Sequence, residues 1–267
     1  MTAGPPDTSG NAEEPILITA EMLAPRRPRV VLPSDGRIDF ERHMRKLPPL
    51  VIAVVAANVA VFAWEVAAGS FLESKELIES GVAMTNHVNP LEAGALVRAN
   101  VLAGEWWRMF TAMFLHAGPE HLIGNLIAFY IVGMACEHAF GTVRTAIVYL
   151  WSGVTGAALS LAAGPGPSVG ASGAIFGVLG AVIVTLYRHQ RQFYVRDKRI
   201  GVVLAAWAAW QLVTGFMTPF IDNFAHLGGL FGGALAALVL SPTLTASTRL
   251  MKARGNSPMP SGIRLRP

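Results

Sequence analysis

Residues 170–187 read GASGAIFGVLGAVIVTLY, a stretch without a single charged side chain. A helix that crosses the hydrocarbon core of a bilayer needs about 20 mostly apolar residues. This stretch is apolar enough for a membrane helix but short for a complete crossing. The whole chain of 267 residues shares its character, since 52% of the residues are hydrophobic and only 14% are charged. Soluble domains carry roughly a quarter charged residues, so the composition predicts a membrane protein and argues against a soluble enzyme.

Five further apolar segments surround this stretch, which gives six predicted transmembrane helices and an all-α polytopic membrane protein. We expect a basic, disordered N-terminal segment at 1–47, a six-helix membrane domain at 48–241 and a tail at 242–267. The predicted spans are Leu50–Ala68, Thr111–Ala135, Val143–Ala163, Ser172–Tyr187, Ile200–Met217 and Phe224–Leu240.

Lysine and arginine residues fall mainly on one side of this predicted topology. Of the 21 in the chain, only Lys75, Arg98 and Arg108 lie in loops on the other side. Because cytoplasmic loops carry the excess of Lys and Arg, both termini are predicted to be cytoplasmic. This distribution explains the net charge of +4 without a nucleic-acid partner. The short ends without a transit peptide predict a multi-pass protein of the bacterial inner membrane, and the single cysteine, Cys136, excludes an intrachain disulfide.

Five polar side chains converge near the predicted non-cytoplasmic ends of the spans. Polar groups at this depth are costly and commonly mark a functional site. His121 and Asn125 share a helix face because they are four residues apart. The complete set is His116, His121, Asn125, Ser172 and His226.

Two structural alternatives compete with a catalytic site. The first is a metal site, but a zinc metalloprotease helix carries His-Glu-x-x-His. Here His116 and His121 are interrupted by Gly118 and Pro119, and no cysteine or carboxylate cluster lies nearby, so we predict no metal. The second is a set of hydrogen bonds between helices, which would suit Ser172 or Asn125 taken alone.

The combination of residues favours serine hydrolysis, which needs a nucleophile, a base and donors for the developing oxyanion. Ser172 follows a loop rich in glycine and proline and begins a helix, where the helix dipole favours negative charge. His226 is the candidate base, and His121 and Asn125 are candidate donors. The flanking residues Gly170 and Gly173 would let a substrate backbone approach closely.

Small residues spaced by four predict that the fourth and sixth spans pack closely together. Such stripes allow two membrane helices to approach at their backbones, which would bring Ser172 close to His226. The stripes are Gly173, Gly177 and Ala181 on the fourth span and Gly229, Gly233 and Ala237 on the sixth.

In order and spacing, these residues resemble the rhomboid family of intramembrane serine proteases, over about residues 48–241. Each of these motifs alone is weak evidence for the family, whereas their combination in this order and spacing is specific. The matching pieces are Trp107-Arg108, His116, His121-x-x-x-Asn125, Gly170-Ala171-Ser172-Gly173 and Ala225-His226-x-x-Gly229-x-x-x-Gly233.

The resemblance implies a six-helix rhomboid-like bundle with a Ser172–His226 catalytic dyad. It implies an intramembrane serine endopeptidase that cleaves transmembrane segments of membrane proteins near the non-cytoplasmic side. The implied partners are those substrates and the lipid bilayer, with no cofactor. It also places Phe176 against the catalytic histidine, and it gives an oxyanion and substrate-binding role to His116, His121, Asn125, Gly170, Gly173 and the backbone N–H of Ser172.

Two other functions are carried as alternatives. A catalytically inactive rhomboid-like protein would bind membrane clients without cutting them, and it would be expected to lack the serine or the histidine. A small transporter would carry broken helices within an internal repeat, which is not visible here.

Two acidic residues receive structural predictions. Asp222 precedes His226 by four residues and is predicted to cap the last helix, not to complete a triad. Glu137 is predicted to pair with Arg144 at the cytoplasmic edge.

Overall fold

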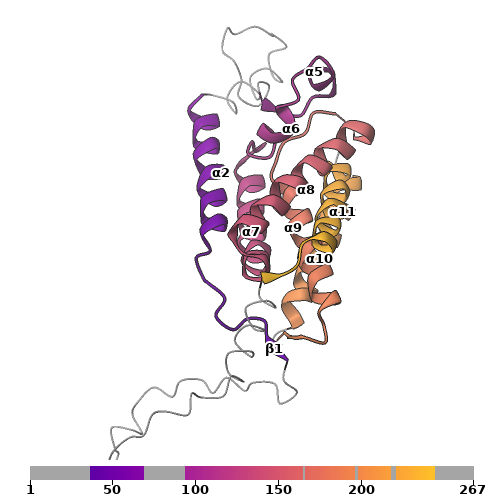
Figure 1. The fold of residues 1–267 in the computed structure, drawn as a ribbon. Coiled ribbons are helices and arrows are strands. Elements are labelled where there is room, and N and C mark those ends of the chain that lie inside the picture. The colour runs from indigo at the N-terminus through magenta and orange to yellow at the C-terminus, as the bar shows by residue number, and fades with distance from the viewer. Residues whose placement is uncertain (1–36, 69–93, 165, 196–197, 218–220, 244–267) are drawn as a thin grey trace, which may run out of the picture.

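The chain forms a bundle of helices in a computed structural model that describes residues 37–68, 94–164, 166–195, 198–217 and 221–243 (Figure 1). Within these described residues, three helices are long and apolar enough to cross a membrane: α2 (Pro49–Ala67), α7 (Pro119–Phe140) and α8 (Thr142–Ala163). Shorter apolar helices are α9 (Ser172–Arg188), the Val202–Met217 part of α10 (Lys198–Met217) and α11 (Asn223–Val239). Each of the six predicted spans overlaps one of these helices, so the mainly helical membrane-protein fold is confirmed.

The second predicted span, Thr111–Ala135, was wrong at its start. A short helix α6 (Arg108–Thr111) ends where the span was expected to begin, and α7 starts at Pro119. Proline suits the first turn of a helix because its φ is already helical and no N–H is needed there. His116 therefore lies in the connection before α7, whereas His121 and Asn125 lie within the helix.

Residues 37–47 are folded, although the sequence predicted disorder up to residue 47. Strand β1 (Ile38–Asp39) pairs in parallel with β2 (Phe193–Tyr194), which lies between α9 and α10. Phe40 is buried and packs edge-on against the rings of His138 at 5.4 Å and Phe193 at 5.5 Å. We call β1, Phe40 and β2 the clip. Residues 1–36 and 244–267 lie outside the described residues, so their predicted organisation stays a prediction.

Helix α9 is the centre of the bundle, with α7, α8 and α11 packed against it. All residues from Gly173 to Val182 are buried. The small-residue stripes explain the close approach of α11, because a Cβ on Gly229 would overlap the carbonyl of Gly173 and one on Gly233 would overlap that of Gly177. The predicted packing of these two stripes is confirmed.

Glu137 joins α7 to the start of α2 and not to Arg144. Its carboxylate accepts hydrogen bonds from the backbone N–H groups of Leu50 and Val51 at 3.1–3.2 Å and from the Thr142 hydroxyl at 2.7 Å. Arg144 donates to the Ser241 carbonyl at 2.5 Å. The predicted Glu137–Arg144 pair was therefore wrong: the carboxylate covers N–H groups that the first turn of a helix leaves unpaired.

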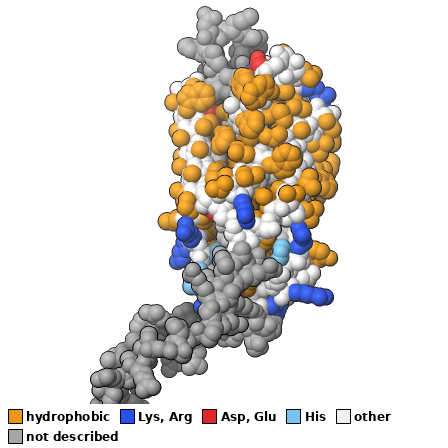
Figure 2. Space-filling model, in the orientation of Figure 1, with side chains coloured by type: hydrophobic (Ala, Val, Ile, Leu, Met, Phe, Trp, Pro, Cys, Tyr) orange, Lys and Arg blue, Asp and Glu red, His pale blue; other side chains and the backbone are white. Residues whose placement is uncertain are grey.

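Hydrophobic side chains cover most of the visible height of the bundle (Figure 2). Most of the visible Lys and Arg side chains lie near its lower end, and a smaller group lies at its upper right. The exposed residues include Trp64 of α2, Trp151 of α8, Phe216 of α10 and Phe231 of α11. An apolar surface this extensive is far larger than soluble monomers expose, and it suits contact with lipid.

Candidate active site

Ser172 is the first residue of α9, and a strained turn precedes it. Gly170 has φ +122°, a conformation that side chains other than glycine rarely adopt. The Gly170 N–H donates to the Ala112 carbonyl at 2.8 Å, which ties this loop to the segment before α7. No side chain among the described residues caps the N-terminus of α9. Its first N–H groups and its dipole are therefore placed to favour negative charge beside Ser172.

His226 lies on α11 within hydrogen-bond distance of Ser172. Its Nε2 is 2.8 Å from Ser172 Oγ, so the hydroxyl donates to Nε2 when that nitrogen is unprotonated. The ring of Phe176, one turn along α9, is stacked on the His226 ring, with centroids 4.4 Å apart and planes 9° apart. Trp207 of α10 lies against Phe176 at 5.5 Å. The imidazole is thus held in one orientation toward Ser172.

Asp222 caps α11 and does not extend the pair into a triad. Its carboxylate accepts from the Ala225 N–H at 2.9 Å and from the Ser160 hydroxyl, so the predicted cap is confirmed. The other ring nitrogen of His226, Nδ1, is buried and has no hydrogen-bond partner in the described part of the chain.

His121 and Asn125 of α7 lie beside the turn at Gly170. A Cβ on Gly170 would come within 2.6 Å of His121 Cε1 and 3.6 Å of Asn125 Nδ2. The Asn125 amide nitrogen is buried, and no hydrogen-bond partner is described for it. A buried donor without a partner is rare in a folded protein and commonly belongs to a binding site. The two side chains predicted as donors therefore flank the loop that carries Ser172.

Comparison with known proteins identifies the family. Residues 103–243, more than half of the chain, match the family model of the rhomboid domain. The chain belongs to the rhomboid family. It is 38% identical over 164 residues to the rhomboid protease GluP of Bacillus subtilis, covering 61% of this chain and 32% of that protein. The RHOMBOID-like protein 1 of Arabidopsis thaliana is 35% identical over 217 residues, covering 75% of this chain and 55% of that protein.

A third relative matches more evenly along both chains. The rhomboid protease AarA of Providencia stuartii is 29% identical over 218 residues, which cover 71% of each protein. The rhomboid described here spans only about a third of the length of the Bacillus relative and about half that of the Arabidopsis one. The match shows an integral membrane protein of the rhomboid family.

In this rhomboid, His116 is fully buried beside the candidate donors. Its ring lies 5.3 Å from the ring of His121, centroid to centroid. Its backbone N–H donates to the carboxylate of Glu65 of α2 at 3.2 Å. Sequence reasoning missed Glu65, although a carboxylate within an apolar span was a signal in itself, since ionisable groups are costly there.

The loop before α6 is held by Arg108, which the resemblance singled out with Trp107. Arg108 is buried, donates to the Ala95 carbonyl at 3.0 Å and lies 4.9 Å from the centroid of the Trp107 ring. It also bonds Glu105, which lowers the pKa of that carboxyl below its usual range. These contacts of Arg108 hold the loop before α6 together.

No group of three or more His, Cys, Asp or Glu side chains is placed to hold a metal ion among the described residues. His116 and His121 are neighbours, but His121 lies beside the turn at Gly170 and His226 contacts the Ser172 hydroxyl. The arrangement suits acid–base and nucleophilic chemistry.

Proposed function

We propose that this chain is an intramembrane serine endopeptidase that cleaves transmembrane segments of membrane proteins. The observation that carries the proposal is the 2.8 Å contact between Ser172 Oγ and His226 Nε2 inside an apolar helix bundle. Two of the relatives described above are named as rhomboid proteases, which supports the same activity.

In the proposed mechanism, the Ser172 hydroxyl attacks the carbonyl carbon of the scissile bond while His226 Nε2 accepts its proton. His226 then gives this proton to the leaving amine, and an acyl-enzyme on Ser172 remains. Water attacks the ester with His226 again as the base. The stacked Phe176 ring keeps the imidazole aligned through both steps.

The oxyanion would be stabilised from two helices. The backbone N–H of Ser172 at the start of α9, the His121 ring and the Asn125 amide are the proposed donors. Each such donor contributes on the order of 10²–10³ in rate in serine hydrolases. The unpaired Asn125 nitrogen supports this assignment, because the oxyanion would supply its missing acceptor. The space beside Gly170 is taken by the His121 ring, and a Cβ on Gly173 would meet the Ala225 carbonyl oxygen of α11 at 3.2 Å. The absence of side chains at Gly170 and Gly173 therefore serves the packing of the site, and no substrate-binding role is proposed for Gly173. His116 packs beside His121.

The proposed topology has six crossings, both termini in the cytoplasm and the site near the opposite face, in a bacterial inner membrane. The Lys and Arg distribution supports it. The clip independently supports the part of this topology between residues 38 and 193, because β1 precedes α2 and β2 follows α9. Two segments that pair must lie on the same side of the membrane, so an even number of crossings separates them. Helices α2, α7 and α8 alone would give an odd number, which favours a crossing by α9 despite its shorter length.

The proposed chemistry uses only groups of the chain and a water molecule, so we expect activity without a metal or cofactor. The preferred substrates should be transmembrane segments whose outer end contains Gly or Pro. Unwinding a helix turn in hydrocarbon exposes polar groups at several kcal/mol each, and helix-weakening residues lower that cost.

The test is labelling of the purified protein with a fluorophosphonate probe, followed by mass mapping of the modified residue. We expect modification of Ser172, with no label and no cleavage of a model transmembrane substrate in Ser172→Ala or His226→Ala. Thermal unfolding of both variants controls for misfolding. An intact fold that binds membrane clients but takes no label would replace the proposal with an inactive rhomboid-like protein.

A further inference from the structure

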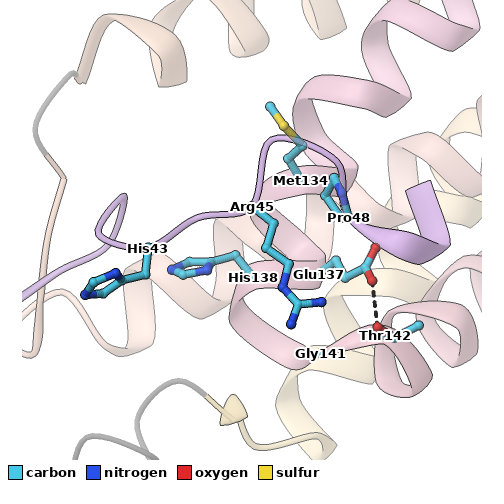
Figure 3. Close-up of a pocket in the computed structure, with 8 residues that line it drawn as sticks. All are labelled: His43, Arg45, Pro48, Met134, Glu137, His138, Gly141 and Thr142. Carbon is cyan, nitrogen blue, oxygen red and sulfur yellow. Dashed lines mark hydrogen bonds between the residues drawn. The ribbon is translucent and has the colours of Figure 1, made fainter. Parts of the chain in front are cut away.

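A cavity of about 260 Å³ lies where the segment before α2 meets the turn between α7 and α8 (Figure 3). It is far from the candidate active site, because His121 is near the start of α7 whereas Glu137 and His138, which line the cavity, are near its end. Nothing in the proposed proteolysis uses it.

Three of the side chains that line this cavity are basic. His43 and Arg45 come from the segment before α2, and His138 comes from α7. In Figure 3 the Arg45 guanidinium points toward the turn at Gly141 and Thr142. The Nε2 atom of His138 is buried and has no hydrogen-bond partner within the described residues. Arg45 is always a donor, whereas a histidine nitrogen such as His138 Nε2 donates to an acceptor-rich ligand when the ring is protonated.

The wall also contains one acidic residue, Glu137, whose negative charge opposes an anion in the cavity. Both oxygens of its carboxylate are already engaged by the N–H groups of Leu50 and Val51 and by the Thr142 hydroxyl. No hydrogen bond between this carboxylate and Arg45 is found within the described residues, and the positive charge of Arg45 offsets the negative charge of Glu137.

The N-terminus of α8 opens onto the same cavity. Its N-cap residue is Gly141, and no side chain caps the helix. The unpaired N–H groups and the dipole of this 22-residue helix favour an anion at this point. The basic side chains and the N-terminus of α8 thus both favour an anionic ligand.

The position of the cavity indicates which kind of anion it would bind. It lies at the end of the bundle where Lys and Arg side chains border the hydrophobic surface (Figure 2), which is the depth of lipid headgroups. Basic pockets between membrane helices at this level bind anionic headgroups. The volume is slightly below the range of about 300–1,000 Å³ typical of small-molecule pockets, so it suits a headgroup and not a whole lipid.

We propose that this pocket binds a phosphate group through Arg45, His43, His138 and the N-terminus of α8. The phosphate would be carried by an anionic phospholipid of the surrounding leaflet or by a soluble phosphate. In either case the ligand would bridge the segment before α2 to the α7–α8 turn.

The test measures ligand-induced thermal stabilisation of the full chain in neutral detergent. The probes are short-chain phosphatidic acid, short-chain phosphatidylcholine and inorganic phosphate, each against chloride at matched ionic strength. Arg45→Gln is compared with Lys46→Gln, which removes one charge from the neighbouring exposed residue outside the cavity. His43→Gln is a second cavity variant. The dissociation constant is taken from the titration, so a shifted starting Tm does not affect the comparison.

We expect saturable stabilisation by phosphatidic acid, with a dissociation constant about tenfold higher in Arg45→Gln and unchanged in Lys46→Gln. Saturation by inorganic phosphate with the same dependence on Arg45 would identify a soluble ligand as sufficient. A response to the lipid alone would identify the headgroup. Stabilisation no greater than chloride gives, or equal weakening by Arg45→Gln and Lys46→Gln, would overturn the proposal.

Discussion

Replacing Gly170 with alanine tests the site through a single methyl group. The new Cβ would lie 2.6 Å from His121 Cε1 and 2.8 Å from His121 Nε2, whereas nonbonded carbon atoms settle at about 3.5–4.0 Å. The His121 ring is the end of a half-buried side chain and can give way. It would have to move by about 1 Å, a displacement that can cost about 10² in rate when a catalytic group is affected.

The substitution is expected to lower both the free energy of unfolding and the catalytic rate, for separate reasons. Alanine at φ +122° costs about 1–3 kcal/mol of backbone strain. Loss of one oxyanion donor lowers the rate by about 10²–10³, or about 2.7–4 kcal/mol of transition-state stabilisation. Gly104→Ala is the matched control, because Gly104 has φ +107° and a Cβ there meets nothing within 4 Å.

The assay measures kcat on a fluorogenic transmembrane substrate together with thermal unfolding. We expect similar losses of Tm in Gly170→Ala and Gly104→Ala, but a fall in kcat of about 10² or more only in Gly170→Ala. If Gly170→Ala retained the kcat of Gly104→Ala, the placement of His121 in the oxyanion site would be refuted.

Three further predictions address the histidine, the clip and the substrate. Phe176→Ala should lower kcat by up to about tenfold, because it removes the ring stacked on His226; an unchanged kcat in a folded variant would show that the stacking does not orient the base. Phe40→Ala should reduce the free energy of unfolding by about 3 kcal/mol, since the ring is buried between His138 and Phe193. Leu47→Ala, at an exposed residue, should have little effect. Equal losses of the two variants in a denaturant titration would contradict this prediction. Replacing a Gly/Pro pair in a substrate helix with leucines should slow cleavage, measured by gel, and equal rates would contradict the proposed unwinding step.

The proximity of Ser172 and His226 was predictable because it depends on local patterns. Glycines spaced by four on α9 and α11 require close backbones, and both residues stand near the same ends of these helices. The helix that carries His121 and Asn125 was also predictable, but its start was not. The apolar run before Gly118 and Pro119 has the composition of a span, and only the proline indicated the break. The catalytic roles of all four residues stay predictions until they are tested.

Contacts between distant segments were beyond sequence reasoning. Glu137 binds backbone N–H groups 86 and 87 residues away, and no residue type marks such an acceptor in advance. Charge complementarity suggested Arg144, which has another partner. The strands of the clip are two residues each, too short to produce an alternating pattern.

The clip also has a consequence for the order of events during synthesis. Ile38 is made early, but its partner Phe193 follows only about 150 residues later, on the order of ten to thirty seconds at ordinary elongation rates. The helices between them must enter the bilayer before the strands can meet. The clip is therefore among the last contacts to form, and until it closes the aromatic ring of Phe40 has no partner strand to cover it. Pairing of β1 with β2 would thus report that the intervening helices have reached their final sides of the membrane.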